Sequence, residues 1–261
     1  MVDREKILRY YRASGDGELA ARLLDLAEAS LKNNKYKVSE FLDPHGYSIT
    51  ETIAAHYPRL QLKGEGGYEG SERLKIAFVN EEFRGTPDYL IEVVSVTWDG
   101  RYYHLTHRDV LGALLGVGIK REVLGDIVMQ GDGCQCIIDA SLTEFILSQL
   151  IKVGPAPISV RKGNLSDIPP KEVKVKEIKT TVASLRLDVV AAAGFGMSRS
   201  RMSEEISAEK LKVNWQESKN SAQTVKVGDI ISMRGRGRVE VCDVMGQTKK
   251  GRISIFLKRF I

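Results

Sequence analysis

The chain has 261 residues, of which 43% are hydrophobic and 28% are charged, an ordinary composition for a folded protein of two or three modules. It contains no apolar run of the roughly 18 residues that a membrane span requires, and its charged N-terminus lacks the apolar segment of a secretory signal. Three cysteines make no disulfide framework, so we expect a cytoplasmic protein without a membrane span.

The net charge of +5 is distributed unevenly along the chain. Residues 171–261 carry 19 Lys and Arg against 10 Asp and Glu, whereas residues 1–170 carry 20 against 24. Basic charge concentrated in one part of a chain is typical of nucleic-acid binding. We therefore look for the binding surface in the C-terminal third.

Residues 1–84 are predicted to form an N-terminal α+β domain. Helices are expected over 2–12, 17–33 and 48–57, with a strand and turn over 38–46, because apolar residues recur there at helical and strand spacing. Strands over 60–63 and 73–80 flank the glycine-rich loop 64–73, which matches neither a phosphate-binding loop nor a dinucleotide fingerprint. The loop is a flexible connection, or alternatively a tip contacting RNA or the ribosome, with Tyr68 able to stack and Arg73 able to meet phosphate.

Residues 85–162 are predicted to form a separate compact domain. Strands over 89–98, 126–130, 134–138 and 156–161 alternate with a helix over 107–116, capped by Thr106, and a helix over 142–152, capped by Ser141. The order β-α-β-β-α-β is the ferredoxin-like plan, which RNA-recognition-motif (RRM) domains also use. The central strands lack the aromatic residues with which an RRM stacks bases, so base stacking on this sheet is doubtful. Residues 163–180, rich in Pro, Lys and Glu, are predicted to be a linker.

The candidates for chemistry in this part of the chain favour no catalytic or metal site. His104, His107 and Asp109 lack a further ligand of suitable spacing, and Cys134 and Cys136 fit buried positions on one side of a strand. We expect no cofactor. Arg108 with Asp109, and Arg121 with Asp126, are expected to form ion pairs at helix ends; the alternative is a second basic contact with RNA through Arg108, Lys120 and Arg121.

Residues 181–261 are predicted to fold as a small basic α+β domain. A first helix ends at Gly194–Gly196, a second begins after Ser198, and strands follow around residues 211–215 and 230–233. Arginine forks suit phosphate oxygens, and glycines let a backbone approach a ligand closely. The predicted RNA-binding residues are therefore Arg186, Ser198, Arg199, Arg201, Lys212, Asn214, Arg234, Arg236 and Arg238; the alternative is a solvated basic surface.

The order of these motifs resembles the S4 RNA-binding domain. The matching stretches are Arg186-Leu187-Asp188, Ser198-Arg199, Val213-Asn214 and Val227-Gly228-Asp229-Ile230. Two residues depart from the pattern, because Glu209 and Trp215 occupy positions where that family often has glycine. The departure at Glu209 could loosen the turn, and Trp215 could place an aromatic ring on the RNA side.

Nearly the whole chain is similar to the YlmH family of bacterial proteins. The similarity is carried by residues 41–44, 66–73, 107–116, 118–121, 125–127 and 131–133, together with the variants at 213–215 and 234–238. It implies a cytoplasmic RNA-binding factor that docks on rRNA or tRNA at the large ribosomal subunit and acts in the rescue of stalled translation. We expect it to be a monomer without enzymatic activity. The family has also been linked to cell division. It includes a cyanobacterial and plastid branch described as photosystem II S4-domain proteins.

An RNA-modifying enzyme is the alternative of a different class, because S4-type modules also accompany pseudouridine synthases and methyltransferases. The former would need a catalytic domain with its own aspartate, and the latter a Gly-x-Gly loop between a strand and a helix; we find neither upstream. The sequence leaves open which RNA is bound and what the N-terminal domain contacts.

Overall fold

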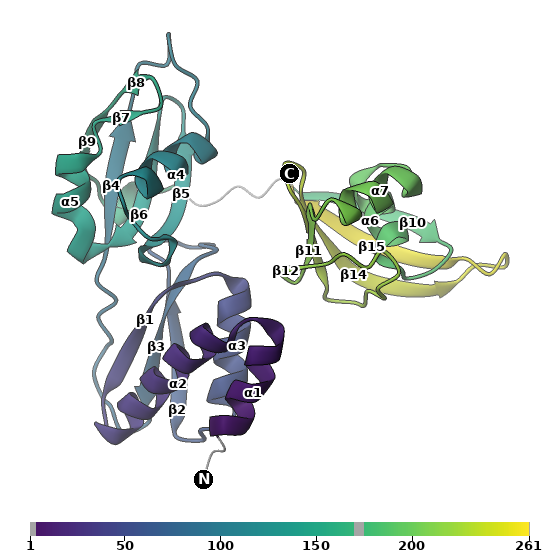
Figure 1. Ribbon diagram of the computed structural model, residues 1–261, viewed down its shortest axis with the longest axis horizontal. Coiled ribbons are helices and arrows are strands. Elements are labelled where there is room, and N and C mark those ends of the chain that lie inside the picture. The colour runs from purple at the N-terminus through teal and green to yellow at the C-terminus, as the bar shows by residue number, and fades with distance from the viewer. Residues whose placement is uncertain (1–3, 170–174, 261) are drawn as a thin grey trace. The chain divides into compact units, whose positions relative to one another are not determined.

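A computed structural model describes residues 4–169 and 175–260 and divides the chain into two compact units, Met1–Lys171 and Glu172–Ile261 (Figure 1). The described residues form seven α-helices and four β-sheets, so the predicted mixed α+β class is confirmed. The start of the first predicted helix and part of the predicted linker fall on residues 1–3 and 170–174, outside the described residues. Among the helices that are described, none combines the length and apolar character needed to cross a bilayer.

The first unit begins with three helices packed against one face of a three-stranded sheet (Figure 1). Leu23 and Leu24 of the second helix and Ile53 of the third meet Phe78 of the central strand in a buried core. The sheet order is β1-β3-β2, and both pairs are antiparallel. The elements are α1 (Arg4–Ser14), α2 (Gly17–Lys32), β1 (Tyr36–Leu42), α3 (Pro44–Ala54), β2 (Leu60–Glu65) and β3 (Leu74–Asn80).

Helix α3 begins four residues earlier than predicted. We expected Asp43 and Pro44 to form a turn before a helix at Ser48. Instead, the Asp43 side chain accepts a hydrogen bond from Gly46 N at 2.9 Å and caps the helix, and Pro44 occupies its first turn. Proline suits that position because its missing N–H would have no intrahelical partner.

The second half of this unit is a four-stranded antiparallel sheet, ordered β5-β6-β4-β9, with two helices on one face. The element order β4-α4-β5-β6-α5-β9 is the predicted β-α-β-β-α-β order. Thr106 caps α4, as predicted, through a reciprocal capping box with Asp109. Helix α5 is shorter than the predicted helix over 142–152, because it begins after Leu142 and ends at Gln149. The elements are β4 (Ile91–Thr97), α4 (His107–Gly116), η1 (Arg121–Val123), β5 (Leu124–Gln130), β6 (Gly133–Asp139), η2 (Ala140–Leu142), α5 (Thr143–Gln149), β7 (Lys152–Val153), β8 (Ala156–Pro157), β9 (Ser159–Lys162) and η3 (Leu165–Asp167).

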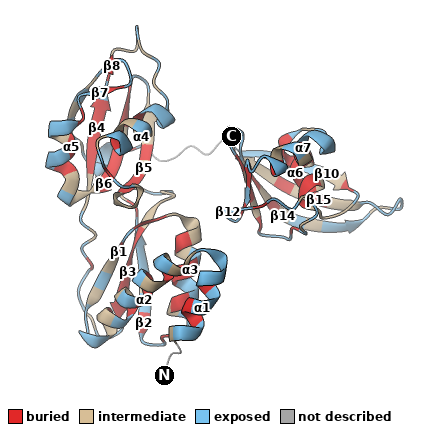
Figure 2. Cartoon of the chain, in the orientation of Figure 1, coloured by how far each residue is buried: buried red, intermediate tan, exposed pale blue. Residues whose placement is uncertain are grey.

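The other face of the four-stranded sheet is partly covered by side chains from outside it. Phe41 from the end of β1 and Ile168 after η3 form a buried cluster with Val93 and Ile137 of the sheet, and Tyr68 packs against this cluster. Figure 2 shows buried residues running through both halves of this unit. The two parts of residues 1–169 therefore share a core, and the four-part division of the chain remains a prediction.

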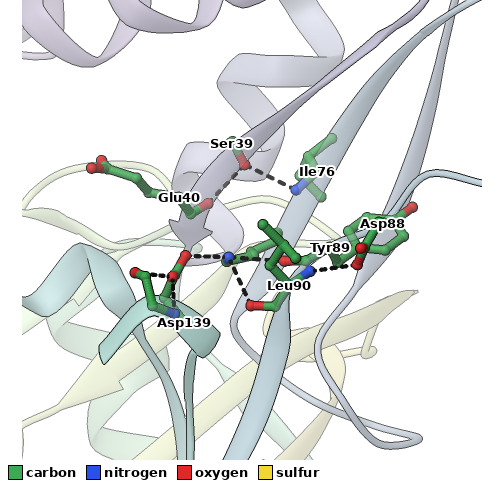
Figure 3. Close-up of polar contacts among 9 residues, drawn as sticks. Ser39, Glu40, Ile76, Asp88, Tyr89, Leu90 and Asp139 are labelled. Atoms are coloured by element: carbon green, nitrogen blue, oxygen red, sulfur yellow. Dashed lines mark hydrogen bonds and ion pairs between the residues drawn. The ribbon is translucent and has the colours of Figure 1, made fainter. Parts of the chain in front are cut away.

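A buried lysine also joins these two parts. The Lys75 side chain on β3 is 4% exposed, and its Nζ donates to Asp139 Oδ2 at 2.5 Å and to the carbonyl oxygen of Tyr89 at 2.9 Å. Figure 3 shows the convergence of Asp139, Tyr89 and Leu90 at this point. Burial favours the protonated form of the Asp139 carboxyl, but hydrogen bonds from Lys75 and Ser141 outweigh it and lower its pKa. The ammonium is thus paired and hydrogen-bonded, as a buried charge must be.

The second unit is a six-stranded antiparallel sheet with two helices packed on one face (Figure 1). Its core holds Phe195 and Met202 from the helices and Val239, Val241 and Leu257 from the sheet. The strand order is β10-β15-β14-β13-β11-β12. The elements are β10 (Val175–Val182), α6 (Leu187–Phe195), α7 (Arg199–Ser207), β11 (Leu211–Val213), β12 (Gln216–Glu217), β13 (Ile230–Met233), β14 (Gly237–Gln247) and β15 (Ile253–Phe260).

The predicted linker over 163–180 is wrong for residues 175–180. Residues 175–182 form β10, which pairs with the full length of β15, from Val175 opposite Phe260 to Val182 opposite Ile253. Ile178 and Val182 pack on the core, while Glu177 and Lys179, on either side of Ile178, are exposed. That alternation marks a half-buried strand, and the Pro, Lys and Glu content obscured it.

Candidate nucleic-acid interface

Two predicted arginines share one buried carboxylate in the second unit. Asp188, in the first turn of α6, accepts hydrogen bonds from Arg186 Nε and Nη2, both at 3.1 Å, and from Arg199 Nε at 2.9 Å. The Asp188 side chain is 3% exposed, whereas those of Arg186 and Arg199 are 38% and 57% exposed. The carboxylate therefore fixes one edge of each guanidinium, and each arginine side chain stays partly exposed to solvent.

The protonation state of Asp188 follows from this geometry. Burial alone would raise the pKa of its carboxyl, but the hydrogen bonds and charges of Arg186 and Arg199 outweigh burial and lower the pKa below its usual value. Asp188 is consequently ionised at neutral pH, and it orients two cations while cancelling only one of their charges. The pair keeps a net positive charge at the surface.

A second group of cations surrounds Glu205 on α7. Lys210 Nζ lies 2.6 Å from Glu205 Oε2, and this bond, with the charges of Arg201 and Arg236, lowers the pKa of Glu205. The turn carrying Arg236 is fixed there because Arg234 N donates to Lys210 O at 3.0 Å. The start of α7 and the β13–β14 turn therefore contribute to one basic surface, although they are more than 30 residues apart in sequence.

The Arg-Gly-Arg-Gly-Arg run forms the tight turn between β13 and β14. Gly235 and Gly237 have φ values of +76° and +82°, which glycine adopts without strain. Arg234 and Arg236 are exposed on this turn. Arg259 stabilises the turn, because its guanidinium donates to Arg236 O at 3.5 Å and to Phe195 O at 3.3 Å. Sequence reasoning missed Arg259 as a member of this region, although an arginine at an inward-facing position of β15 was an available signal.

Two of the predicted residues lie on the other face of the sheet. Lys212 lies between the buried Leu211 and Val213, and Arg238 precedes the buried Val239. Because side chains alternate along a strand, Lys212 and Arg238 point away from α6 and α7. Arg238 stacks over Phe260 with 5.8 Å to the ring centroid. Lys212 and Arg238 therefore lie on the face of the sheet opposite α6 and α7, and their contact with RNA remains a prediction.

The two predicted polar residues have structural roles in the fold. Ser198 caps α7, and its hydroxyl oxygen accepts from Arg201 N at 3.4 Å. The Asn214 side chain donates to Asp229 Oδ1 and accepts from Ile230 N, both at 2.9 Å. The Asn214 amide therefore holds a turn, so its proposed contact with RNA would compete with these bonds.

Three of the five predicted secondary contacts are engaged inside the first unit. The Tyr68 hydroxyl donates to Asp126 at 2.8 Å, and burial raises its pKa. The Arg73 guanidinium donates to the carbonyl oxygens of Phe41, Leu124 and Arg121, and burial lowers its pKa. Arg121 donates to the carbonyl oxygens of Leu124 and Gly125, and burial lowers its pKa to about 10. The glycine-rich loop is thus bound to the four-stranded sheet and is not a free tip.

The remaining candidates of the first unit can be placed plainly. Arg108 and Lys120 are exposed. Cys134 and Cys136 are buried on one side of β6, with their sulfur atoms 3.8 Å apart, as predicted. The Asp109 carboxylate is occupied by the α4 cap, and no cluster of three metal-binding side chains occurs among the residues that the structure describes.

The fold and the site together define an α+β protein with an arginine-bearing surface suited to a polyanion. Residues 85–167 match the family model described as "Putative RNA-binding domain in YlmH", and residues 176–258 match "Mitochondrial transcription rescue factor 1, C-terminal domain". A Bacillus subtilis (strain 168) protein named ribosome-associated protein quality control protein P2 is 33% identical over 230 residues, which cover 86% of this chain and 88% of that protein.

The chain belongs to the YlmH family. A solved structure, cell division protein ylmH from Streptococcus pneumoniae, matches with a TM-score of 0.50 over 59% of this chain and 93% of that chain. At 19% identity this likeness concerns the fold alone. The predicted family membership is confirmed.

Proposed function

We propose that this chain is a ribosome-associated RNA-binding factor. It binds folded RNA with the face of its C-terminal unit that carries α6 and α7. The observation that carries the proposal is that Asp188 fixes Arg186 and Arg199 in the same unit that holds the cations around Glu205. Guanidinium groups held in place at a surface meet phosphate oxygens with little further loss of entropy. The names of the matching family domain and of the Bacillus subtilis relative point to RNA and to the ribosome.

The finer parts of the proposal follow from the resemblance and the charge distribution. The C-terminal unit acts as an S4-type domain, and residues 85–162 form an RRM-like domain. The partner is rRNA or tRNA at the large ribosomal subunit, and the process is the rescue of stalled translation. The protein acts in the cytoplasm as a monomer, without cofactor or catalysis. In the RRM-like domain, the cover of Phe41 and Ile168 over part of the sheet disfavours base stacking there.

The decisive test replaces Arg199 and Arg201 together by Ala and measures the affinity for deproteinised large-subunit RNA. Removing one arginine–phosphate interaction reduces the slope of log affinity against log salt by about 0.7 to 0.9, so the slope should fall by roughly 1.5. The matched control is Lys249→Ala with Lys250→Ala, in the exposed turn at the opposite end of β14 from Arg236. It removes the same charge from the same unit.

We expect the Arg199/Arg201 variant to bind at least tenfold more weakly at about 0.1 M salt, and the control variant to bind like the parent. Equal weakening in both would mean that net charge alone drives binding, and unchanged binding in the first would place the RNA surface elsewhere. Turnover of RNA incubated with a labelled methyl donor, or formation of pseudouridine, would contradict the non-enzymatic part of the proposal.

A further inference from the structure

The turn between β11 and β12 holds a tryptophan in a backbone conformation that disfavours it. Val213 pairs with Gln216, which leaves Asn214 and Trp215 as the two turn residues, with φ values of +50° and +66°. Positive φ at both positions is the pattern of a type I′ hairpin turn, in which asparagine followed by glycine is strongly preferred. Asn214 fits this pattern, but Trp215 occupies the position that suits glycine.

A bulky residue with positive φ is an outlier, because its Cβ approaches its own backbone closely. Asn214 contributes two hydrogen bonds to the fold, whereas the Trp215 indole N–H has no hydrogen-bond partner among the residues that the structure describes. The ring is also partly exposed. Strain of this kind persists where the side chain serves a function, so it motivates a search for a ligand.

Backbone hydrogen bonds connect the segment after this hairpin to Asp188, the residue whose carboxylate orients the two arginines. The hairpin continues through Ser218, whose N–H donates to Leu211 O. The segment that follows reaches the start of α6, where Ser221 O accepts from Asp188 N at 3.1 Å and Gln223 O accepts from Leu187 N at 2.8 Å. The chain leaving Trp215 thus forms part of the support of the Arg186–Asp188–Arg199 group.

We propose that Trp215 stacks on an unpaired nucleobase of the RNA bound by this unit. The inference rests on the proposed function and adds a base contact to the phosphate contacts. An indole ring offers a large flat surface, and stacking between an aromatic side chain and a base tolerates any base. The bound RNA therefore presents a single-stranded loop, bulge or end to the hairpin. Phosphate contacts from the arginines position the RNA, and Trp215 selects against fully paired RNA at this point.

The first test compares Trp215→Gly with Trp215→Phe in the full chain. Glycine relieves the strain and removes the ring, so the thermal midpoint should stay equal or rise, by up to about 4–8 °C for a unit of this size. The affinity for a stem–loop RNA should fall about tenfold. Phenylalanine keeps a ring, so its affinity should stay within about threefold of the parent. A lower midpoint for the glycine variant would make Trp215 a packing residue and overturn the proposal.

The second test uses the fluorescence of Trp215 directly. The chain has two tryptophans, and Trp98 is buried in the first unit, so Trp98→Phe leaves Trp215 as the only indole. Addition of the stem–loop RNA should quench this emission, because a stacked base quenches indole. A blunt duplex of equal length should leave it unchanged. Quenching by both RNAs or by neither would overturn the stacking on an unpaired base.

The two proposals fail in different ways. If Trp215→Gly binds the stem–loop as the parent does while the Arg199/Arg201 variant binds weakly, the stacking inference is wrong and the proposed function stands. If the parent protein binds neither the stem–loop nor ribosomal RNA, the proposed function itself is wrong.

Discussion

Replacing Asp188 by Asn separates positioned arginines from net positive charge. The change removes one negative charge and raises the net charge of the chain by one. If charge alone governed RNA affinity, the variant would bind more tightly. If Asp188 holds Arg186 and Arg199 in place, the variant should bind RNA about five- to tenfold more weakly, because the two guanidinium groups are no longer positioned for phosphate. The two explanations therefore predict opposite signs.

The same change has a predictable effect on the free energy of unfolding. Breaking a buried ion pair costs about 3–5 kcal/mol when the remaining charge stays buried. Here the two arginines are 38% and 57% exposed and can regain water, so we expect a loss of about 2 kcal/mol at pH 7. With a typical urea dependence, this lowers the midpoint of the C-terminal unit by roughly 1–2 M.

The loss should depend on pH in one direction. The folded pKa of Asp188 lies below its ordinary value of 3.8, so the folded state binds fewer protons there than the unfolded state. The stabilisation is therefore present above about pH 4 and disappears as the pH falls through the lowered folded pKa. Parent and variant should differ equally at pH 6 and pH 8 and converge in acid.

The control is Glu204→Gln, which removes the same charge from an exposed position on α7. It should leave the unfolding free energy unchanged and leave RNA affinity unchanged or slightly higher. Tighter RNA binding by Asp188→Asn, or an unfolding free energy equal to that of the parent at pH 7, would refute the positioning role.

Two further changes test the packing of each unit. Lys75→Met should lower the unfolding free energy of the first unit by about 3 kcal/mol, because it removes the ammonium that pairs with Asp139 Oδ2 and donates to the carbonyl oxygen of Tyr89. Trp98 emission during denaturation measures this loss, and an undiminished midpoint would contradict the role of this buried pair. Gly194→Ala should destabilise the second unit by about 1–3 kcal/mol although alanine favours helices by about 1 kcal/mol, because its Cβ would lie 2.7 and 2.9 Å from the Val239 methyl groups. Calorimetry measures this change. Adding Val239→Ala should recover part of the lost stability, because it removes the contacting methyl groups. A stabilised Gly194→Ala variant would contradict the prediction and show that Val239 shifts at little cost.

Much of the fold follows from local sequence signals. The capping box of Thr106 and Asp109, the cap at Ser198 and the alternation in the strands of residues 85–162 are read from neighbouring residues, and the structure agrees with them. The start of α3 and the strand β10 were missed for local reasons as well. Asp43-Pro44 fits both a turn and a helix start, and the lysines of β10 mask its alternation.

The sequence by itself determined the β-α-β-β-α-β order of residues 85–162, the family and the concentration of positive charge in residues 171–261. Only the tertiary structure decided which cations share a surface. Asp188 accepts a hydrogen bond from Arg199, which is 11 residues away in sequence. Lys212 and Arg238 instead lie on the face of the sheet opposite α6 and α7, because side chains alternate along a strand. Tyr68 and Arg73 are engaged by groups some 50 residues distant. Periodicity and capping act within a few residues along the chain, but hydrogen bonds and burial act between residues that folding brings together.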